Sequence, residues 1–310
     1  MNLSFYEVAK ELTDHESYVI FVPNYYPDVN EERLPKVSFV IPTYGSARTI
    51  SRCLKSIRNQ RYPTLEIIVV DGYSEDGTVQ IAEKLGAKVY MFDGLLGEAR
   101  QIGIEKSSGE IVALFDSDII IPHSEWLTDA VKKFYVNENV STVWPYSIRP
   151  PDSPLMSKFF STYSWSILLN LAKNGKGILG GGHSLFRKKC IDEVGGIDIR
   201  LHEFEDFNLA KKLKNKGYKI VFHQDPLYHD SRVSFRETIQ KEFSRAKSSK
   251  KFGISKLTGL SRSEWAYYHI VLGIKGMFKG LLISRDTSWV MFPLFAIIRS
   301  IAYTLTNLLL

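Results

Sequence analysis

Two aspartates one residue apart, Asp116 and Asp118, follow the apolar run Ile111–Phe115. If that run is a strand, its alternate side chains point the same way, and both carboxylates can face one point beyond its end. Paired hard oxygen ligands suit Mg²⁺ or Mn²⁺, and such an ion would stabilise the charge that develops on a departing diphosphate. The spacing therefore predicts a metal site, although two solvated aspartates in a surface turn would have the same spacing.

A further acidic residue, Asp71, ends the apolar stretch Glu66–Val70 and precedes Gly72. A carboxylate at a strand end can accept hydrogen bonds from a base or a ribose, as acidic residues do in other nucleotide-binding folds. The alternative is a turn or a helix cap, and this is the interpretation that fits Ser74 and Asp76.

Alternating apolar patterns indicate the elements that position these residues. Strands are expected over residues 37–41, 66–70, 88–92 and 111–115, and helices over residues 46–59, 78–85 and 96–107. Strands that alternate with helices form an α/β fold with a mainly parallel sheet covered on both faces, and ligands bind beyond the carboxyl ends of the strands. Three separate segments end there in polar residues: Pro42-Thr43-Tyr44, Asp71-Gly72 and Asp116-Ser117-Asp118.

Four motifs in this order resemble family 2 glycosyltransferases of the GT-A fold. They are Pro42-Thr43-Tyr44, Asp71-Gly72 followed by Ser74 and Asp76-Gly77-Thr78, Gly97 followed by Ala99-Arg100 and Gly103, and Asp116-Ser117-Asp118. The resemblance covers residues 36–230 and implies a Rossmann-like GT-A domain. It implies inverting transfer of a sugar from a nucleotide-diphosphate sugar.

The same resemblance assigns roles to single residues. The nucleotide-sugar site would contain Pro42, Thr43, Tyr44, Asp71, Arg100 and Asp116. Asp118 would ligate Mn²⁺ or Mg²⁺ together with Asp116, and His229 would lie against the metal or the diphosphate. A lone histidine such as His229 is, however, more often a structural hydrogen-bonding residue. Gln101 stands where the family more commonly has Asn. We expect this difference to alter the donor pocket without removing the activity.

Inversion requires a base that takes the proton from the acceptor hydroxyl. The family places this base in an acidic pair at the start of a helix, and Glu205-Asp206 corresponds to that pair. We therefore expect Asp206 to be the base and Glu205 to be its catalytic neighbour. The simpler explanation is that both acidic side chains merely favour a helix N-terminus. Gly181 and Gly182 are expected to let a sugar approach the backbone closely, unless they form only a flexible turn.

Residues 231–310 differ in charge from the rest of the chain. They hold 13 Lys and Arg against 4 Asp and Glu, whereas the first 230 residues hold 27 against 30. Apolar and aromatic residues accompany the positive charge, which favours an anionic phospholipid surface and not nucleic acid as the partner. We expect helices that lie in the membrane interface, because Arg299 and Pro293 disfavour a span over residues 289–310. The alternatives are a transmembrane helix and a buried, dimer-forming helical subdomain.

The expected organisation has three parts: an N-terminal leader over residues 1–35, a GT-A catalytic domain over residues 36–230, and a basic, apolar helical region over residues 231–310. The start of the chain lacks a signal-peptide pattern, so we expect a cytoplasmic protein, peripheral on or anchored in the cytoplasmic face of the membrane. The segment 159–171 could add an apolar wall beside a lipid-linked acceptor.

Two other functions stay open. A sugar nucleotidyltransferase would share the fold plan and the metal aspartates, but it would need a glycine-rich, basic phosphate loop where this chain has Pro42-Thr43-Tyr44. A non-catalytic membrane-binding scaffold would not need all four of the expected acidic site residues, Asp71, Asp116, Asp118 and Asp206. We therefore expect a metal-dependent, hexosyltransferase-type enzyme that moves a sugar to a hydroxyl or phosphate of a glycan or lipid-linked acceptor.

Overall fold

The strands that precede the polar segments belong to one nine-stranded sheet. The computed structural model describes residues 19–20, 22, 24–150, 152–160, 162–163, 183–201, 205–230, 235–252, 261, 264, 267–282 and 285–309. The chain divides into two compact units. The sheet unit comprises residues 17–148 and 179–230, and the described residues of the helical unit fall within 149–163 and 235–309.

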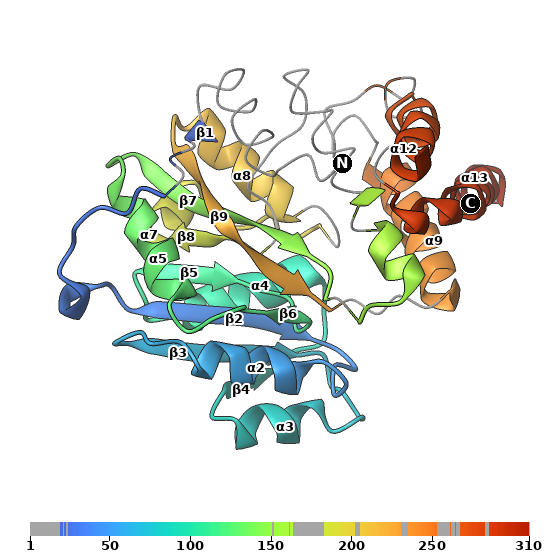
Figure 1. Ribbon diagram of the computed structural model, residues 1–310. Helices are drawn as coiled ribbons and strands as arrows, with labels where there is room; N and C mark the ends of the chain where they lie inside the picture. Colours follow the sequence, from blue (N-terminus) through green and yellow to red (C-terminus); the bar gives the residue numbers. More distant parts are fainter. Residues whose placement is uncertain are drawn as a thin grey trace. The chain divides into compact units, whose positions relative to one another are not determined.

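The strands of the sheet unit follow the order β1-β9-β7-β8-β5-β2-β3-β4, with β6 beside β9 (Figure 1). Strands β2 to β5 form parallel pairs, whereas β8 runs antiparallel to both β5 and β7. The α/β class is therefore confirmed, with a mixed sheet. The bounds are β1 Val19–Ile20, β2 Val37–Thr43, β3 Leu65–Asp71, β4 Lys88–Met91, β5 Ile111–Leu114, β6 Ile119–Ile120, β7 Val140–Ile148, β8 Leu185–Arg187 and β9 Lys219–His229.

Helices cover both faces of this sheet. Phe39 of β2 packs with buried residues of α2 and α5 on one face, and its neighbour Val40 packs with α4, α7 and α8 on the other. The two cysteines, Cys53 and Cys190, are buried in these separate cores and are free thiols. The helices are η1 Glu31–Arg33, α2 Ile50–Arg58, α3 Thr78–Lys84, α4 Leu96–Lys106, α5 Trp126–Lys132, η2 Lys133–Tyr135, α7 Lys188–Glu193 and α8 Glu205–Asn215.

Two glycines let α4 approach its neighbours closely. A Cβ atom on Gly103 would lie 2.2 Å from Cγ1 of Val40, and one on Gly97 would lie 2.8 Å from the carbonyl oxygen of Leu201. Side chains cannot be accommodated at such distances without movement of the helix. The glycines therefore fix the position of α4, and with it that of Arg100, against the sheet.

The helical unit has its own aromatic core. Its described elements are helical residues 155–160 and 162–163, α9 Phe235–Phe252, η3 Tyr267–Val271, α12 Leu272–Leu282, η4 Thr287–Met291 and α13 Phe292–Leu309. The core consists of Met156, Phe159, Phe160, Tyr163, Trp289, Phe292 and Phe295. Phe159 and Phe160 are thus buried in this unit and do not form an exposed wall, and residues 164–171 of the expected wall lie outside the described residues.

The structure revises the expectations for Arg299 and Pro293. Arg299 is buried, and its Nε and Nη2 donate to Oε2 and Oε1 of Glu242 in α9 at 2.6 and 3.0 Å. Pro293 is the second residue of α13, where a missing N–H breaks no helical hydrogen bond. Neither residue therefore interrupts the segment Thr287–Thr306, which is 20 residues long with a mean hydropathy of 1.4 and is long and apolar enough to cross a membrane.

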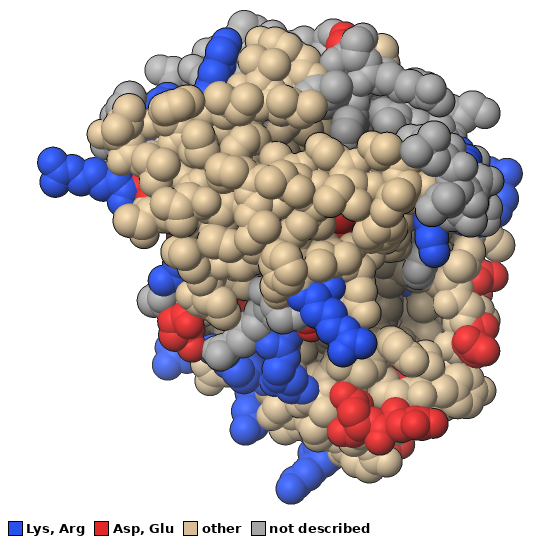
Figure 2. Space-filling view, turned by 90° about the vertical axis from the view of Figure 1, so that its right-hand side faces the viewer, with Lys and Arg blue, Asp and Glu red and all other residues tan. Residues whose placement is uncertain are grey.

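Helices α12 and α13 expose apolar side chains at helical spacing. Along η3 and α12 these are Tyr267, Ile270, Val271, Ile274, Phe278 and Leu282; along η4 and α13 they are Val290, Leu294, Ile297, Ile301 and Leu305. Figure 2 shows one face of the molecule, on which a broad area has few charged side chains. We call these residues the apolar surface of the helical unit.

The boundaries of the units differ from the expected three-part division at two places. Val19–Ile20 pairs with β9 within the sheet, although it falls in the expected leader. Residues 149–163 belong to the helical unit, although they fall inside the expected catalytic range. The boundary after Asp230 separates the two units.

Replacing Gly103 with alanine should destabilise the sheet unit by about 1–3 kcal/mol, the usual cost of overpacking, despite the better helix propensity of alanine. Denaturant unfolding of the full chain measures this. In a Val40→Ala background the added methyl group has room, so Gly103→Ala should cost distinctly less there. Equal losses of unfolding free energy in both backgrounds would show that contact with Val40 is not the reason that alanine is unfavourable at position 103.

Candidate active site

The carboxylate of Asp71 joins the ends of β2 and β3. It is fully buried and accepts hydrogen bonds from Thr43 Oγ1 at 2.6 Å, from the backbone N of Ser74 at 2.7 Å and from Ser74 Oγ at 2.8 Å. Three of its roughly four lone-pair positions are therefore occupied by the protein. Asp71 organises this edge of the sheet, and its direct contact with a nucleotide stays a prediction.

The aromatic ring of Tyr44 lies exposed next to this edge. Pro42 and Thr43 are the last residues of β2, and the Tyr44 side chain that follows them is 79% exposed. The ring lies against Gly72, because a Cβ atom there would be 3.3 Å from Tyr44 Cδ2. Of Pro42, Thr43 and Tyr44, which are all expected at the nucleotide-sugar site, Tyr44 is thus the one whose side chain is most accessible to a base.

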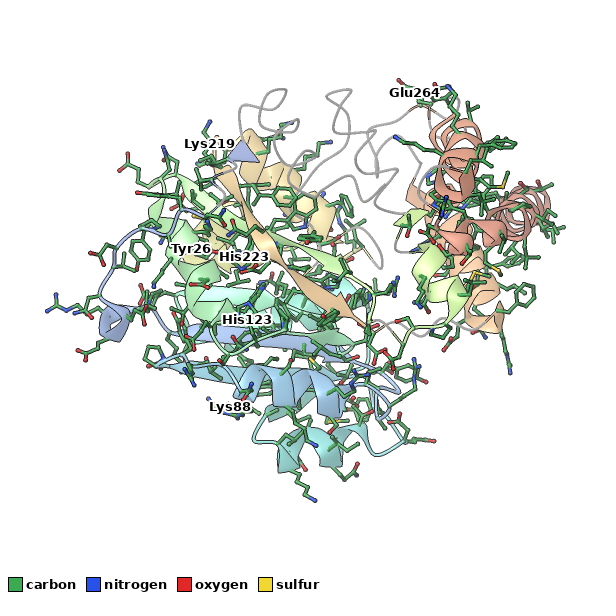
Figure 3. All side chains as sticks on the ribbon, in the orientation of Figure 1. Tyr26, Lys88, His123, Lys219, His223 and Glu264 are labelled. Atoms are coloured by element: carbon green, nitrogen blue, oxygen red, sulfur yellow. The ribbon has the colours of Figure 1, made fainter. Side chains whose placement is uncertain are left out.

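Strand register brings two histidines to Asp116 and Asp118. Ala113 of β5 pairs with Leu185 of the antiparallel β8, so His183 lies beside the residues that follow β5. On the other side, Ile119 of β6 pairs with His229 at the end of β9. Residues far apart in the sequence therefore meet at the carboxyl edge of the sheet. Among the described residues, His123 and His223 (Figure 3) belong to no group of three potential metal ligands.

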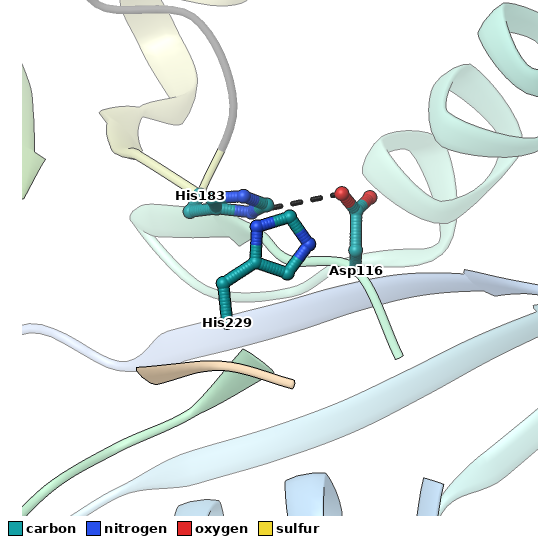
Figure 4. A group of neighbouring side chains, drawn as sticks. All are labelled: Asp116, His183 and His229. Atoms are coloured by element: carbon teal, nitrogen blue, oxygen red, sulfur yellow. Dashed lines mark ion pairs between the residues drawn. The ribbon is translucent and has the colours of Figure 1, made fainter. Parts of the chain in front are cut away.

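Asp116, His183 and His229 present potential ligand atoms within 4.8 Å of one another (Figure 4). His183 Nδ1 is 3.7 Å from Asp116 Oδ2, and the two imidazole rings are 4.9 Å apart between centroids. Asp118 adjoins this group, since its Oδ2 lies 3.3 Å from His229 Nε2. Asp116, Asp118 and His229 were expected near a metal from the sequence, whereas His183 was not.

The protonation of this group suits cation binding. Burial lowers the pKa of His183 to about 4, although the nearby Asp116 carboxylate opposes the shift. Burial would raise the pKa of Asp116, but Arg100 and the histidines outweigh it and hold that pKa below its usual value. At neutral pH the group therefore offers a neutral imidazole and an ionised carboxylate, the forms that bind metals.

Arg100 connects this group to the acidic pair of α8. Its Nη2 donates to Asp116 Oδ1 at 2.6 Å, its Nη1 pairs with Glu205 Oε1, and the side chain is 3% exposed. Burial raises the pKa of Glu205, with Arg100 opposing the shift. Glu205 thus holds Arg100 inside the protein. Arg100 lies next to the expected metal site, but both of its terminal nitrogens are engaged by the protein.

Asp206, the expected base, lies in the first turn of α8 and is partly exposed. Its Oδ1 accepts a hydrogen bond from the backbone N of Phe207 at 2.8 Å. The second carboxylate of the acidic pair is therefore oriented by its own helix and is more accessible than Glu205. Gly181 and Gly182, expected at the sugar site, lie outside the described residues.

The sequence did contain a signal for His183, because this residue ends the segment Gly180-Gly181-Gly182-His183 that precedes an apolar strand. Its backbone adopts a φ of 62°, a left-handed conformation that glycine tolerates best. For another residue this conformation costs about 1–2 kcal/mol. Strain of this kind at a cluster of ligand atoms points to a functional residue.

Comparison with known proteins agrees with this geometry. The sequence model of the family described as "Glycosyl transferase family 2" matches residues 38–195. The chain is 28% identical over 225 residues to "Glycosyltransferase AglE" of Haloferax volcanii. This alignment covers 68% of this chain and 71% of that protein. It is 36% identical over 117 residues to "Poly(ribitol-phosphate) beta-N-acetylglucosaminyltransferase TarS" of Staphylococcus aureus. This shorter alignment covers 35% of this chain and 20% of TarS.

Solved structures share the GT-A fold. Mannosyltransferase PcManGT from Pyrobaculum calidifontis, in complex with GDP-Man and Mn²⁺, aligns over 97% of this chain and 94% of its own, with a TM-score of 0.61 and 18% identity. Glucosyl-3-phosphoglycerate synthase from Mycobacterium tuberculosis aligns over 79% of this chain and 89% of its own, with a TM-score of 0.53 and 18% identity. At such identities the likeness concerns the fold alone.

Replacing Arg100 with methionine should destabilise the protein by about 3–5 kcal/mol, because it leaves Glu205 buried without its cationic partner. Adding Glu205→Gln should recover much of that loss, because the buried side chain at position 205 is then neutral, whereas the other partner of Arg100, Asp116, is 39% exposed. Thermal and denaturant unfolding of the two single variants and the double variant measure the coupling. Additive losses in the double variant would contradict a buried ion pair between these residues.

Proposed function

Because the chain belongs to glycosyl transferase family 2, we propose that it is a metal-dependent, inverting glycosyltransferase with a lipid-linked acceptor. The donor would be a nucleotide-diphosphate sugar, and the acceptor group a hydroxyl or a phosphate. The observation that carries this proposal is the group formed by Asp116, His183 and His229, with Asp118 alongside, at the carboxyl edge of a GT-A sheet. Four potential ligands at that edge fit a cation that binds a diphosphate.

The side chains present fit a divalent cation. His183 Nδ1 is buried without a hydrogen-bond partner among the described residues, so a ligand position there is available. The carboxylates of Asp116 and Asp118 would supply hard oxygen ligands, as Mn²⁺ or Mg²⁺ requires. When bound, the cation would stabilise the negative charge on the departing nucleoside diphosphate.

The other parts of the reaction fall to the protein's own residues. The exposed ring of Tyr44 can stack on the donor base, while Asp71 keeps the ends of β2 and β3 in place. Arg100 is held by Glu205 and in turn fixes the orientation of Asp116. Glu205 is engaged in this ion pair, and the proposed base is Asp206, whose carboxylate is the more accessible of the two.

In the proposed transfer, an acceptor oxygen forms a bond to the anomeric carbon as the bond from that carbon to the donor diphosphate breaks. The attack comes from the face opposite the diphosphate and inverts the anomeric configuration. Asp206 takes the proton from an acceptor hydroxyl, which is the usual role of a positioned general base. A phosphate acceptor would be already deprotonated and would not need this step.

A lipid-linked acceptor is supported by the apolar surface of the helical unit. Two helices expose apolar residues along their length, and Lys275 and Lys279 are exposed on α12. Apolar side chains combined with basic ones favour the interface of an anionic bilayer. Arg299 is turned inwards to Glu242, so its charge does not interrupt the apolar surface. Attachment on the cytoplasmic face stays a prediction from the sequence.

A screen of nucleotide-diphosphate sugars with Mn²⁺ tests the proposed activity. The protein should release a nucleoside diphosphate from at least one donor. Asp206→Asn should keep donor affinity but reduce transfer to a hydroxyl acceptor on the order of 10²- to 10⁴-fold. Asp192→Asn, which changes an exposed aspartate outside the site, should leave transfer unaltered.

Four results would contradict the proposal or one of its parts. Release of pyrophosphate would indicate a nucleotidyltransferase, and no turnover of any donor would favour a non-catalytic scaffold. Normal transfer by Asp206→Asn to a hydroxyl acceptor would exclude Asp206 as the base. Retention of the anomeric configuration in the product would exclude the inverting mechanism.

The double variant Phe278→Glu/Ile297→Glu should lose most binding to vesicles that contain anionic lipid. Each substitution removes about 1.5–3 kcal/mol of favourable free energy from burying an apolar side chain in the membrane. Each should therefore weaken partitioning about tenfold or more. Cosedimentation of the full chain measures this. Ile199→Glu changes an exposed apolar residue of the sheet unit and is the control. Equal binding by both variants would contradict a membrane role for the apolar surface.

A further inference from the structure

His183 combines an unpartnered polar atom with an unfavourable backbone. Its Nδ1 is buried and has no hydrogen-bond partner among the described residues. Its φ of 62° lies in the left-handed region, where glycine would be unstrained. The chain has three glycines directly before this position, yet it has a histidine here. Both features are unfavourable for the protein alone, which indicates that the imidazole serves a bound group.

A buried histidine without a partner is not by itself a metal site. His223 is also buried, and neither of its ring nitrogens has a hydrogen-bond partner among the described residues. It packs against Trp126, with ring centroids 5.0 Å apart, and belongs to no group of three potential ligands. His183 differs because Asp116 and His229 direct their own ligand atoms to the same place (Figure 4). The surrounding ligands, and not burial alone, single out His183.

The three ligand atoms are close enough for one ion to reach. They lie within 4.8 Å of one another, and metal bonds to nitrogen and oxygen are about 2.0–2.2 Å long, so small side-chain rotations bring them to one centre. The three side chains come from separate elements: the end of β5, the residues before β8 and the end of β9. The sheet therefore fixes the relative positions of the ligands.

The chemistry of this set is unusual for Mg²⁺. That ion prefers oxygen ligands and keeps several waters, whereas imidazole is a ligand for first-row transition ions. Two imidazoles beside one carboxylate shift the balance away from Mg²⁺. We propose that His183 is a protein ligand of the cation and that it biases the site towards Mn²⁺ and other first-row transition ions over Mg²⁺. This inference rests on the metal dependence within the proposed function.

The direct test is cation binding by the full chain in the absence of any donor. Mn²⁺ binding is followed through the loss of the free-ion electron paramagnetic resonance signal, and Mg²⁺ binding through competition with Mn²⁺. His183→Asn is the informative variant, because asparagine tolerates the left-handed conformation but lacks the imidazole. We expect Mn²⁺ affinity to fall on the order of 10- to 100-fold, a loss seen even for residues that only orient a ligand. Mg²⁺ affinity should change much less.

Two further variants sharpen the comparison. His183→Asp supplies an oxygen ligand instead, so it should bind a cation again, with the preference shifted towards Mg²⁺. His123→Asn is the matched control, because His123 also lies beside an aspartate, 3.8 Å from Asp225, but outside the group. This control should keep the affinities of the unchanged protein for both ions.

The outcomes separate this inference from the function on which it rests. Equal Mn²⁺ affinity and equal Mn²⁺ over Mg²⁺ preference in folded His183→Asn would overturn the role of His183 and leave the glycosyltransferase proposal in place. Absence of cation binding by the unchanged protein, even with a nucleoside diphosphate added, would overturn both the inference and the metal dependence. A selective loss of Mn²⁺ binding in His183→Asn supports the inference whether or not the donor sugar has been identified.

Discussion

A single buried guanidinium connects the parts of the candidate site. Arg100 extends from α4 and lies between Asp116, which follows β5, and Glu205, which begins α8. A charge buried to this degree is tolerated only when partners surround it, so these three segments must be correctly placed together or not at all. The glycines of α4 therefore belong to the function of the site as much as its carboxylates do, because they set how near Arg100 comes to the sheet.

The reversal of chain direction at β8 is the second constraint. In a purely parallel sheet, only the residues that follow strands reach the carboxyl edge. Because β8 is antiparallel to β5, a residue that precedes β8 reaches the same edge. This is why His183, before β8, meets His229, at the end of β9. The mixed sheet thus brings two potential nitrogen ligands to an aspartate, one of which, His183, a purely parallel sheet would not place there.

The parts of this arrangement that local patterns determine were predictable from the sequence. Apolar runs located β2, β3, β4 and β5 to within one or two residues, and the motifs indicated the GT-A fold, the family and the carboxylates at the sheet edge. The glycine-rich segment before His183 was a signal in the sequence, but the approach of this residue to Asp116 and His229 was not predictable, because it depends on the pairing of β8 with β5 and on a backbone conformation that no residue type dictates. The partner of Arg299 was missed for a similar reason. Glu242 lies on α9, and only packing of that helix against α13 brings the two charges together.

The inward-facing pair of Glu242 and Arg299 has a practical consequence for producing this protein. A common way to obtain a soluble form of a membrane-associated enzyme is to end the chain before its last apolar helix. Here that would remove Arg299 and leave the Glu242 carboxylate, which is fully buried, with Arg245 as its remaining cationic partner among the described residues. Such a shortened chain would expose the aromatic core of the helical unit as well and would tend to aggregate. Changing outward-facing apolar residues of α12 and α13 to polar ones, with α13 retained, would leave the Arg299–Glu242 ion pair and the aromatic core intact.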